Sequence, residues 1–175
     1  VEGGEGGGFK NPQPVATMVL LPLIRERTEV PIIAAGGICD GATMAAAFAM
    51  GAEGVQLGTA MLSCTDSPVH PNWKNAIYQG KETDTVFLNQ QGRPALRAMR
   101  TERTGELELL GQFQPFEHMA NILDLYFGGD LEAAIPLTGQ VMGRIHEARS
   151  AADIVTSTMT GFYQSLSRLD ASYGQ

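Results

Sequence analysis

Apolar residues in the first third of the chain form short runs and helical spacings, and glycines separate them. The runs Val30–Ala35 and Val55–Leu57 are brief and apolar and end at glycines, which predicts two buried strands. Between them, the small-residue segment Gly41–Met50 predicts a helix, with Asp40 as its N-cap and Gly51 closing it. We therefore expect the order strand, helix, strand in this stretch.

The preceding segment, Val15–Arg27, has apolar residues at helical spacing and a charged end, which predicts an amphipathic helix that Pro22 kinks or restarts. Val1 reads as the end of a further strand. Helices that alternate with strands in this way predict βαβ units, a parallel sheet and right-handed crossovers. The fold class that follows is α/β.

The hydrophobic pattern becomes less regular after Ser63. The segment Asp84–Asn89 then predicts one further strand, which is followed by a turn over residues 89–94. Arginines three and four residues apart then predict a helical face over Leu96–Arg103. Such a face is either solvated or binds an anion. The arginines concerned are Arg93, Arg97, Arg100 and Arg103.

Helical patterns fill the rest of the chain. They cover Phe116–Phe127, Leu131–Ile135, Gly139–Ile145 and Ala151–Leu169. We expect Ser150 to cap the last helix, with Asp153 as the acidic partner. The expected division is residues 1–65, a loop-rich segment 66–110 with one strand, and a helical domain 111–175.

Composition narrows the class of protein. The chain has 175 residues, 43% hydrophobic and 18% charged, so it can bury a core. A formal net charge of −7 argues against nucleic acid as a partner, and no apolar run is long enough for a membrane span. Cys39 and Cys64 form neither a metal spacing nor a disulfide framework, which favours a reducing, cytoplasmic location and no metal site.

The glycines after the two predicted strands are the strongest sign of chemistry. Gly36-Gly37 and Gly58-Thr59 leave backbone N–H groups free where strands end, which suits a phosphate. A (β/α)₈ barrel uses two such ends in the loops after its last strands. The alternative is that both are simply tight turns. The glycine-rich segment Val1–Pro14 is likewise either a loop that approaches a ligand closely or a flexible tail.

Five segments of the chain together resemble a known family. They read EGGEGGGF, IIAAGGICDG, GAEGVQLGTAML, DTVFLNQQGRPALRAMR and GDLEAAIPLTGQVMGRI. In this order they are similar to the C-terminal half of the nitronate monooxygenase (2-nitropropane dioxygenase) family, which includes flavin-type enoyl-acyl carrier protein reductases. The resemblance implies a (β/α)₈ barrel, followed here by a mainly helical small domain, with flavin mononucleotide (FMN) between the two. Because such barrels need about 250 residues and no initiator methionine is present, we expect a fragment that lacks the N-terminal half.

The resemblance also implies which residues hold the cofactor. These are Glu2, Gly8, Ala35, Gly36, Gly37, Gln56, Gly58 and Thr59. Oriented N–H donors and the Thr59 hydroxyl suit the phosphate on physical grounds as well. Gln56 is expected to point into the barrel or to lie beside the flavin ring. Glu2 is either close to the flavin or a solvated strand end.

One departure from the family concerns proton transfer. The family's glycine loop ends in a histidine that handles the substrate proton, but Phe9 stands in its place here, so no catalytic residue is assigned. Phe9 is expected to shield one face of the flavin from water. Lys10 is expected to point elsewhere. The histidines of the chain, His70, His118 and His146, show no spacing that would compensate.

The leading hypothesis is therefore an FMN-dependent oxidoreductase acting on a nitronate, or on an unsaturated acyl thioester with NAD(P)H. The alternative is a degenerate flavin- or phosphate-binding barrel that acts inside a larger complex. A third possibility is another kind of phosphate-binding barrel. Such barrels share the glycine turns but not the late GDLEAAIPLTGQVMGRI segment. With three or four strands the chain cannot close a barrel alone, so a homodimer is expected.

Overall fold

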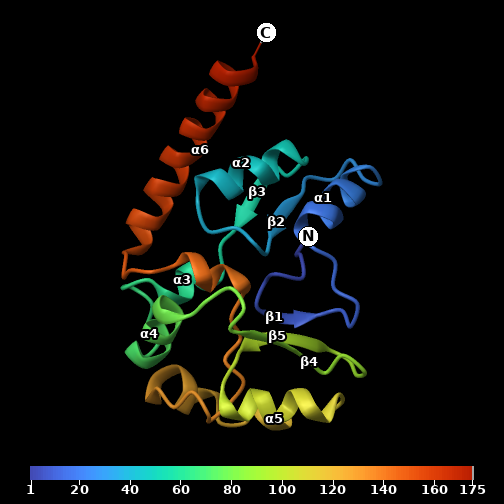
Figure 1. The fold of residues 1–175 in the computed structure, drawn as a ribbon, viewed down its shortest axis with the longest axis vertical. Coiled ribbons are helices and arrows are strands. Elements are labelled where there is room, and N and C mark those ends of the chain that lie inside the picture. The colour runs from blue at the N-terminus through green and yellow to red at the C-terminus, as the bar shows by residue number, and fades with distance from the viewer. Residues whose placement is uncertain (175) are drawn as a thin grey trace.

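The computed structural model describes residues 1–174. Within this range it contains six α-helices and five β-strands, and the strands form two separate sheets. Figure 1 shows the parallel sheet and its helices in the upper part and the antiparallel sheet in the lower part. The glycine-rich N-terminal segment lies between the two.

The upper sheet consists of β2 (Ile33–Ala35) and β3 (Gly54–Gln56), which pair in parallel. The start of the chain runs beside β2 in the same direction, because Glu2 forms a parallel bridge to Ala35 and Gly3 N–H donates to the Ala35 carbonyl at 3.0 Å. The parallel β2–β3 pair confirms the expected order of strand, helix and strand, whereas the expected strand end at Val1 is present only as an isolated bridge at Glu2. Ile32 and Ala34 are buried beneath the helices of this part.

The helices of the upper part begin and end where the sequence predicts, within a few residues. They are α1 (Thr17–Arg25), α2 (Gly41–Ala49) and the short α3 (Thr59–Ser63). Asp40 caps α2 by accepting a hydrogen bond from Thr43 N–H at 2.9 Å, and Gly51 follows that helix with φ of +97°. Pro22 lies inside α1 without ending it, so the expected restart there is wrong, whereas the expected kink stays a prediction.

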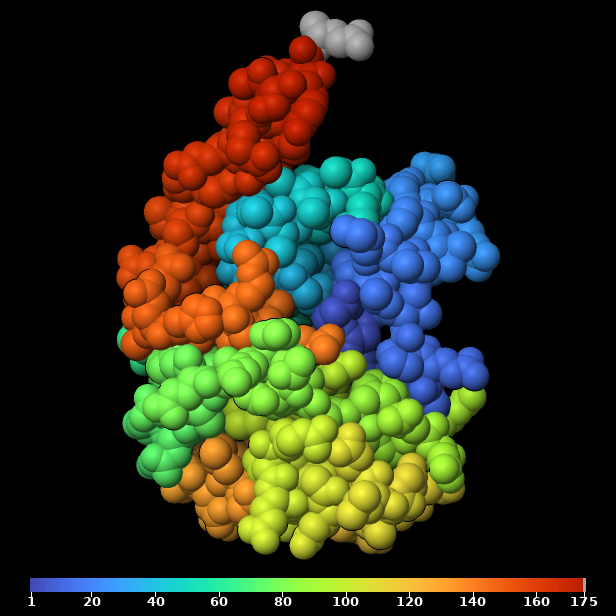
Figure 2. All heavy atoms as spheres, viewed as in Figure 1, coloured from blue at the N-terminus to red at the C-terminus, as the bar shows by residue number. Residues whose placement is uncertain are grey.

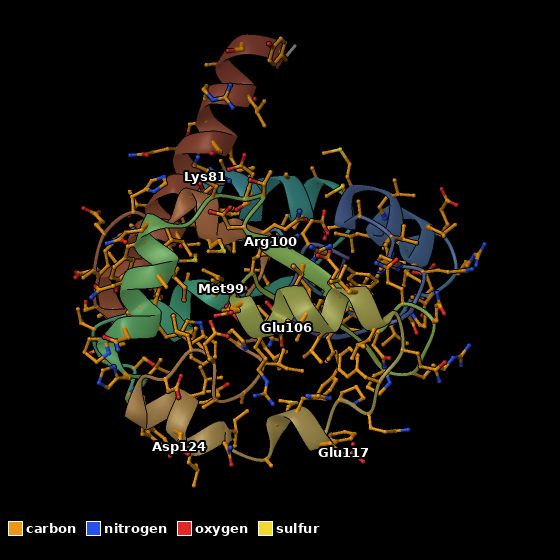
Figure 3. All side chains as sticks on the ribbon, turned by 60° about the horizontal axis from the view of Figure 1, so that its bottom comes forward. Lys81, Met99, Arg100, Glu106, Glu117 and Asp124 are labelled. Atoms are coloured by element: carbon orange, nitrogen blue, oxygen red, sulfur yellow. The ribbon has the colours of Figure 1, made fainter. Side chains whose placement is uncertain are left out.

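The lower sheet is antiparallel, with the order β1 (Gly8–Lys10), β5 (Ala95–Met99) and β4 (Thr85–Leu88). Helices α4 (Pro71–Gln79) and α5 (Glu102–Leu110) belong to this part. Figure 3 shows Met99 and Arg100 at the end of β5 and Glu106 on α5, which packs against β4. The pairing of β1 with β5 joins the N-terminal segment to the lower sheet.

The expected arginine face on a helix is wrong. Residues 95–99 are a strand, and Arg97, Arg100 and Arg103 have different protein partners. Arg97 donates to the Gly4 carbonyl, Arg100 pairs with Glu108 at 2.8 Å, and Arg103 donates to the Glu132 carbonyl at 3.1 Å. Leu96 and Ala98 are buried between β1 and β4, so non-local pairing overrides the helical spacing.

The expected helix Phe116–Phe127 is present only in part, because it is not one continuous α-helix. This stretch contains a 3₁₀ turn at Glu117–Met119 and a π-helical turn at Asp124–Gly128, seen at the lower edge of Figure 3. Leu131–Ile135 forms no helix, and Gly139–Ile145 contains only a 3₁₀ helix, Gln140–Arg144. The segment 66–149 is therefore a mixture of short helices, strands and turns.

The long helix α6 (Ala151–Tyr173) packs on α2 of the upper part. Ser150 caps it as expected, since its hydroxyl accepts from Asp153 N–H at 3.0 Å. The C-terminal turns project beyond the rest of the molecule in Figure 2. The domain boundaries at residues 65 and 110 stay predictions, and Gln175 lies outside the described residues.

No helix among residues 1–174 is long and apolar enough to cross a membrane.

Candidate functional site

A cavity of about 300 Å³ lies where the glycine loop meets the ends of β2 and β3. All eight residues that the sequence singled out as cofactor contacts line this one cavity. They are Glu2, Gly8, Ala35, Gly36, Gly37, Gln56, Gly58 and Thr59. Three separate segments, 2–8, 35–38 and 56–62, thus meet at one cavity, and their contact with a cofactor stays a prediction.

Hydrogen bonds hold the glycine loop in place from several sides. The Glu5 carboxylate accepts from Thr17 N–H at 3.0 and 3.1 Å, so it caps the start of α1. The Thr17 hydroxyl lies 3.1 Å from Glu5 Oε2 and 2.9 Å from the Gly36 carbonyl oxygen. Gln140 N–H donates to the Glu5 carbonyl at 2.9 Å. The loop is therefore a fixed wall of the cavity rather than a flexible tail.

Close packing against backbone explains Gly7, whereas Gly6 lies against the end of the Glu2 side chain. A Cβ on Gly6 would lie 2.1 Å from Glu2 Oε1, and one on Gly7 would lie 2.6 Å from the Thr138 backbone. Gly8 and Gly58 differ, because a Cβ at either position would meet nothing within 4 Å. Both line the cavity, so the space in front of them is open to a ligand.

The turn after β2 presents backbone donors. Gly36 and Gly37 have φ of +83° and +77°, a region that L-residues with side chains rarely adopt. Within residues 1–174 the N–H groups of Gly37 and Ile38 donate to no backbone or side-chain acceptor. Because an unpaired N–H is costly when it is buried, such donors are normally satisfied by water or by a ligand.

The turn after β3 is tied to the far wall. Thr59 Oγ1 accepts a hydrogen bond from Gly139 N–H at 3.0 Å, and its own proton stays available to a cavity ligand. In the described structure no side chain caps the start of α3, so the first N–H groups of that helix are also free. Thr59 thus faces the cavity as a donor.

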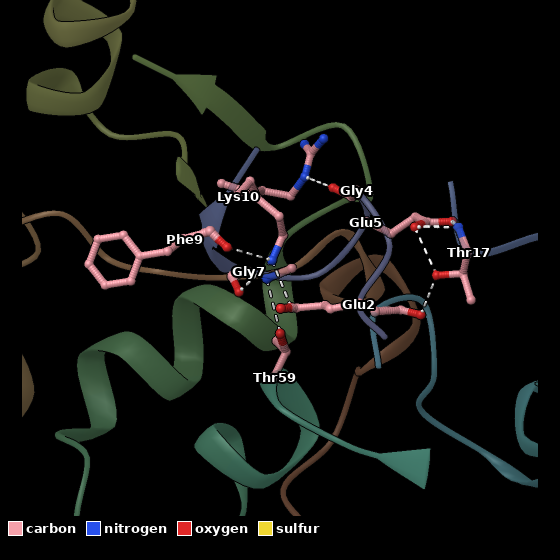
Figure 4. Close-up of polar contacts among 11 residues, drawn as sticks. Glu2, Gly4, Glu5, Gly7, Phe9, Lys10, Thr17 and Thr59 are labelled. Carbon is pink, nitrogen blue, oxygen red and sulfur yellow. Dashed lines mark hydrogen bonds and ion pairs between the residues drawn. The ribbon is translucent and has the colours of Figure 1, made fainter. Parts of the chain in front are cut away.

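The structure places Phe9 outside the lining of the cavity, so its expected role as a shield of the flavin is not supported. Its ring is 45% exposed and lies 5.8 Å from that of Phe116. Lys10 instead turns inward, contrary to expectation, and its Nζ lies 2.7 Å from Glu2 Oε1 (Figure 4). Adjacent strand residues face opposite sides, which explains this reversal.

The histidines lie elsewhere. His70 caps α4 by accepting from Asn72 N–H at 3.1 Å, and His118 lies 3.5 Å from Arg103. His146 lines a second cavity behind the glycine turns, with Cys39, Cys64 and Arg144. Burial raises the pKa of the Cys39 thiol, although Arg144 opposes this shift. None of the three histidines is among the residues that line the first cavity.

Sequence reasoning missed several wall residues. The late segment contributes Leu137, Gly139 and Val141, and Leu62 adds a further apolar surface. Gly6, Gly7 and Ile38 complete the lining. The sequence marks the late segment only as a motif shared with the family. No local pattern indicates that this segment folds back over a loop more than 120 residues earlier in the chain.

The chain belongs to the nitronate monooxygenase family, whose model matches residues 1–161. It is 42% identical over 99 residues to a probable nitronate monooxygenase of Staphylococcus saprophyticus, covering 53% of this chain and 28% of that protein. It is 39% identical over 115 residues, 65% of this chain and 32% of the relative, to a Rhodococcus jostii protein. That protein is named (3aS,4S,5R,7aS)-5-hydroxy-7a-methyl-1-oxo-octahydro-1H-indene-4-carboxyl-CoA dehydrogenase.

Among solved structures, FabK from Thermotoga maritima superposes with a TM-score of 0.90 at 32% identity. The match covers 98% of this chain and 56% of the FabK chain. The protein therefore spans about half the length of that structure, and the matched part covers about a third or less of these curated relatives.

Proposed function

We propose that the cavity binds the phosphate and ring of FMN and that the whole protein is a flavin-dependent oxidoreductase. The observation that carries this proposal is the convergence of all eight predicted cofactor contacts on one cavity. Its volume of about 300 Å³ lies at the lower end of the range for small-molecule sites. The parallel strands are then neighbours in a (β/α)₈ barrel.

The residues present fit this cofactor. Free N–H groups at Gly37 and Ile38 and the Thr59 hydroxyl would hold the phosphate. The open space in front of Gly8 and Gly58 leaves room for the ligand's closest approach. Apolar side chains of the late segment, such as Leu137 and Val141, offer a dry surface for the ring. Bound flavin would supply hydride and electron transfer, while the protein supplies placement.

The acyl-thioester branch of the family is favoured as the substrate class. Phe9 stands where the family has its proton-handling histidine, so proton removal from a neutral nitroalkane lacks the family's usual base. Hydride transfer from NAD(P)H to a flavin needs no such base. The name of the Rhodococcus relative, a carboxyl-CoA dehydrogenase, agrees with a thioester substrate.

A second candidate is a flavin-binding protein without turnover, and the outward-facing Phe9 favours it. Two assays of the intact protein with bound FMN separate the hypotheses. We expect oxidation of NAD(P)H with an enoyl thioester and slower oxygen consumption with a nitronate. Yellow protein that is reduced by neither NADH nor NADPH would support the second candidate. A homodimer that pairs open strand edges stays a prediction.

A further inference from the structure

Glu2 is the one ionisable residue in the lining of the cavity, as far as residues 1–174 are concerned. The other lining residues are glycines, apolar residues, Gln56 and Thr59. Arg97 and Glu5 lie close by, but their side chains are bound to Gly4 and Thr17 on the other side of the loop. Among the described lining residues, the Glu2 carboxylate is therefore the group that is suited to accept a proton from a bound substrate.

Lys10 holds that carboxylate from behind. The Lys10 side chain is only 5% exposed, whereas that of Glu2 is 41% exposed. Lys10 Nζ lies 2.7 Å from Glu2 Oε1 and donates to the carbonyl oxygens of Gly7 and Phe9 at 3.3 and 3.4 Å (Figure 4). These acceptors use all three protons of the ammonium group. The lysine is thus fully occupied and is not itself available to a ligand.

The other oxygen of Glu2 remains available. Among the described residues, Glu2 Oε2 takes part in no hydrogen bond or ion pair. Gly6 leaves space for the carboxylate, since a Cβ there would lie 2.1 Å from Glu2 Oε1. One oxygen is therefore anchored, and the other has no partner among the described residues in a side chain that is 41% exposed. A general base needs this arrangement, because it must be fixed in position and still have a free lone pair.

We propose that Glu2 is the proton-accepting residue of the cavity and that Lys10 is its positioning residue, in place of the missing histidine. This inference rests on the proposed function. Glu2 Oε2 takes the proton from a C–H bond next to a nitro group or a thioester carbonyl. The electron pair of the broken bond moves onto the nitro or carbonyl oxygen, and the Glu2 carboxylic acid returns a proton in the reverse step. This reversible exchange requires no oxidant.

The test measures proton transfer separately from flavin turnover. The intact protein with bound FMN is incubated with nitroethane in D₂O without oxygen, and exchange of the α-hydrogen is followed by NMR. We expect Glu2→Gln to slow the catalysed exchange by about 10²- to 10⁴-fold. Lys10→Met should slow it by about 10- to 100-fold because the carboxylate loses its position. Lys10→Arg, which keeps the charge, should retain most of the rate.

A double variant separates positioning from folding. Glu2→Gln/Lys10→Met removes both charges, so it leaves no unpaired buried ammonium and should fold even if Glu2→Gln does not. We expect it to exchange no more slowly than Glu2→Gln. Lys74→Met is the matched control, since Lys74 also donates to backbone carbonyls, of Thr65 and Ser67, but lies outside the cavity.

The outcomes are distinct. The inference is overturned if the Glu2→Gln variant or the double variant, with FMN bound, still exchanges the α-hydrogen of nitroethane at the wild-type rate. The proposed function would remain intact in that case. If Lys10→Met slows the exchange by the same factor with and without Glu2→Gln, Lys10 has only a structural role. If wild-type protein binds no FMN at all, the proposed function fails, and the inference fails with it.

Discussion

The Arg97 guanidinium donates through Nε to the Gly4 carbonyl oxygen at 2.6 Å, across 93 residues of chain. The same side chain donates to Thr85 Oγ1 at 2.9 Å and lies over the Phe87 ring at 5.4 Å. Burial lowers the pKa of Arg97, and the nearby charge of Glu5 opposes that shift. One side chain thus connects the lower sheet to the loop that forms a wall of the cavity.

Replacing Arg97 should therefore loosen this wall. We expect Arg97→Met to lower the free energy of unfolding by about 1.5–3 kcal/mol, the range for hydrogen bonds of charged groups. Arg100→Met is the control, because Arg100 forms an exposed pair with Glu108 and should cost at most about 1 kcal/mol. Urea denaturation of both variants checks this, and equal losses would contradict the role assigned to Arg97.

Close packing of α2 on α6 gives a second prediction. A Cβ on Gly41 would lie 2.1 Å from Phe162 N, which is backbone and cannot move aside cheaply. Gly41→Ala should therefore cost about 3 kcal/mol or more. On the α6 side of the same contact, a Cβ on Gly161 would lie 3.4 Å from Gly41 Cα, which is an ordinary van der Waals distance. Gly161→Ala should therefore be neutral or stabilising by up to about 1 kcal/mol. Thermal denaturation showing similar Tm values for both variants would contradict this packing.

Acid stability should depend on Asp40. Burial would by itself raise the pKa of this carboxyl, but hydrogen bonds from Thr43 and the charge of Arg144 outweigh it and hold the pKa below its ordinary value. Because the folded-state pKa is lowered, the stabilisation is present above the unfolded-state pKa and is lost as the pH falls through the folded-state pKa.

The variant Asp40→Asn isolates this effect, since asparagine also caps helices. We expect the difference in unfolding free energy between wild type and variant to be constant between about pH 5 and 8 and to shrink below about pH 4. Asp153, whose pKa is lowered first by the Ser150 hydroxyl, is present in both proteins and cancels. Urea denaturation at several pH values provides the measurement, and a difference that stays constant as the pH falls from about 5 into the acid range would be inconsistent with it.

The upper part could be predicted from sequence because its signals are local. Asp40, the glycine stops and the apolar runs lie within a few residues of the elements they define. The lower sheet could not be predicted in the same way. Residues 95–97 pair with β1, more than 80 residues earlier in the chain. The helical spacing of the arginines gives the wrong prediction because strand pairing and burial decide the conformation of residues 95–99.

The residues of the site likewise divide into those that local sequence predicts and those that only tertiary folding brings to the cavity. The sequence predicts the positions of the glycine turns, but its prediction that the Lys10 side chain points elsewhere is wrong, because Lys10 turns toward Glu2. Its alternation with Phe9 along β1 was a usable signal, because an outward Phe9 requires an inward Lys10. The wall formed by Gly139 carried no such signal, since only tertiary folding brings it 3.0 Å from Thr59 Oγ1.

The central claim, that the glycine-lined cavity holds FMN, is tested most directly by flavin titration of matched glycine variants. Gly58 and Gly105 both have nothing within 4 Å of a Cβ, and neither has a positive φ, so a side chain can start at each position without a clash at its Cβ. Gly58 lines the cavity, whereas Gly105 lies on α5. We predict that wild type and Gly105→Leu bind FMN with equal affinity and that Gly58→Leu loses at least about tenfold, or 1.4 kcal/mol. Equal binding by all three proteins, or none by the wild type, would contradict the account.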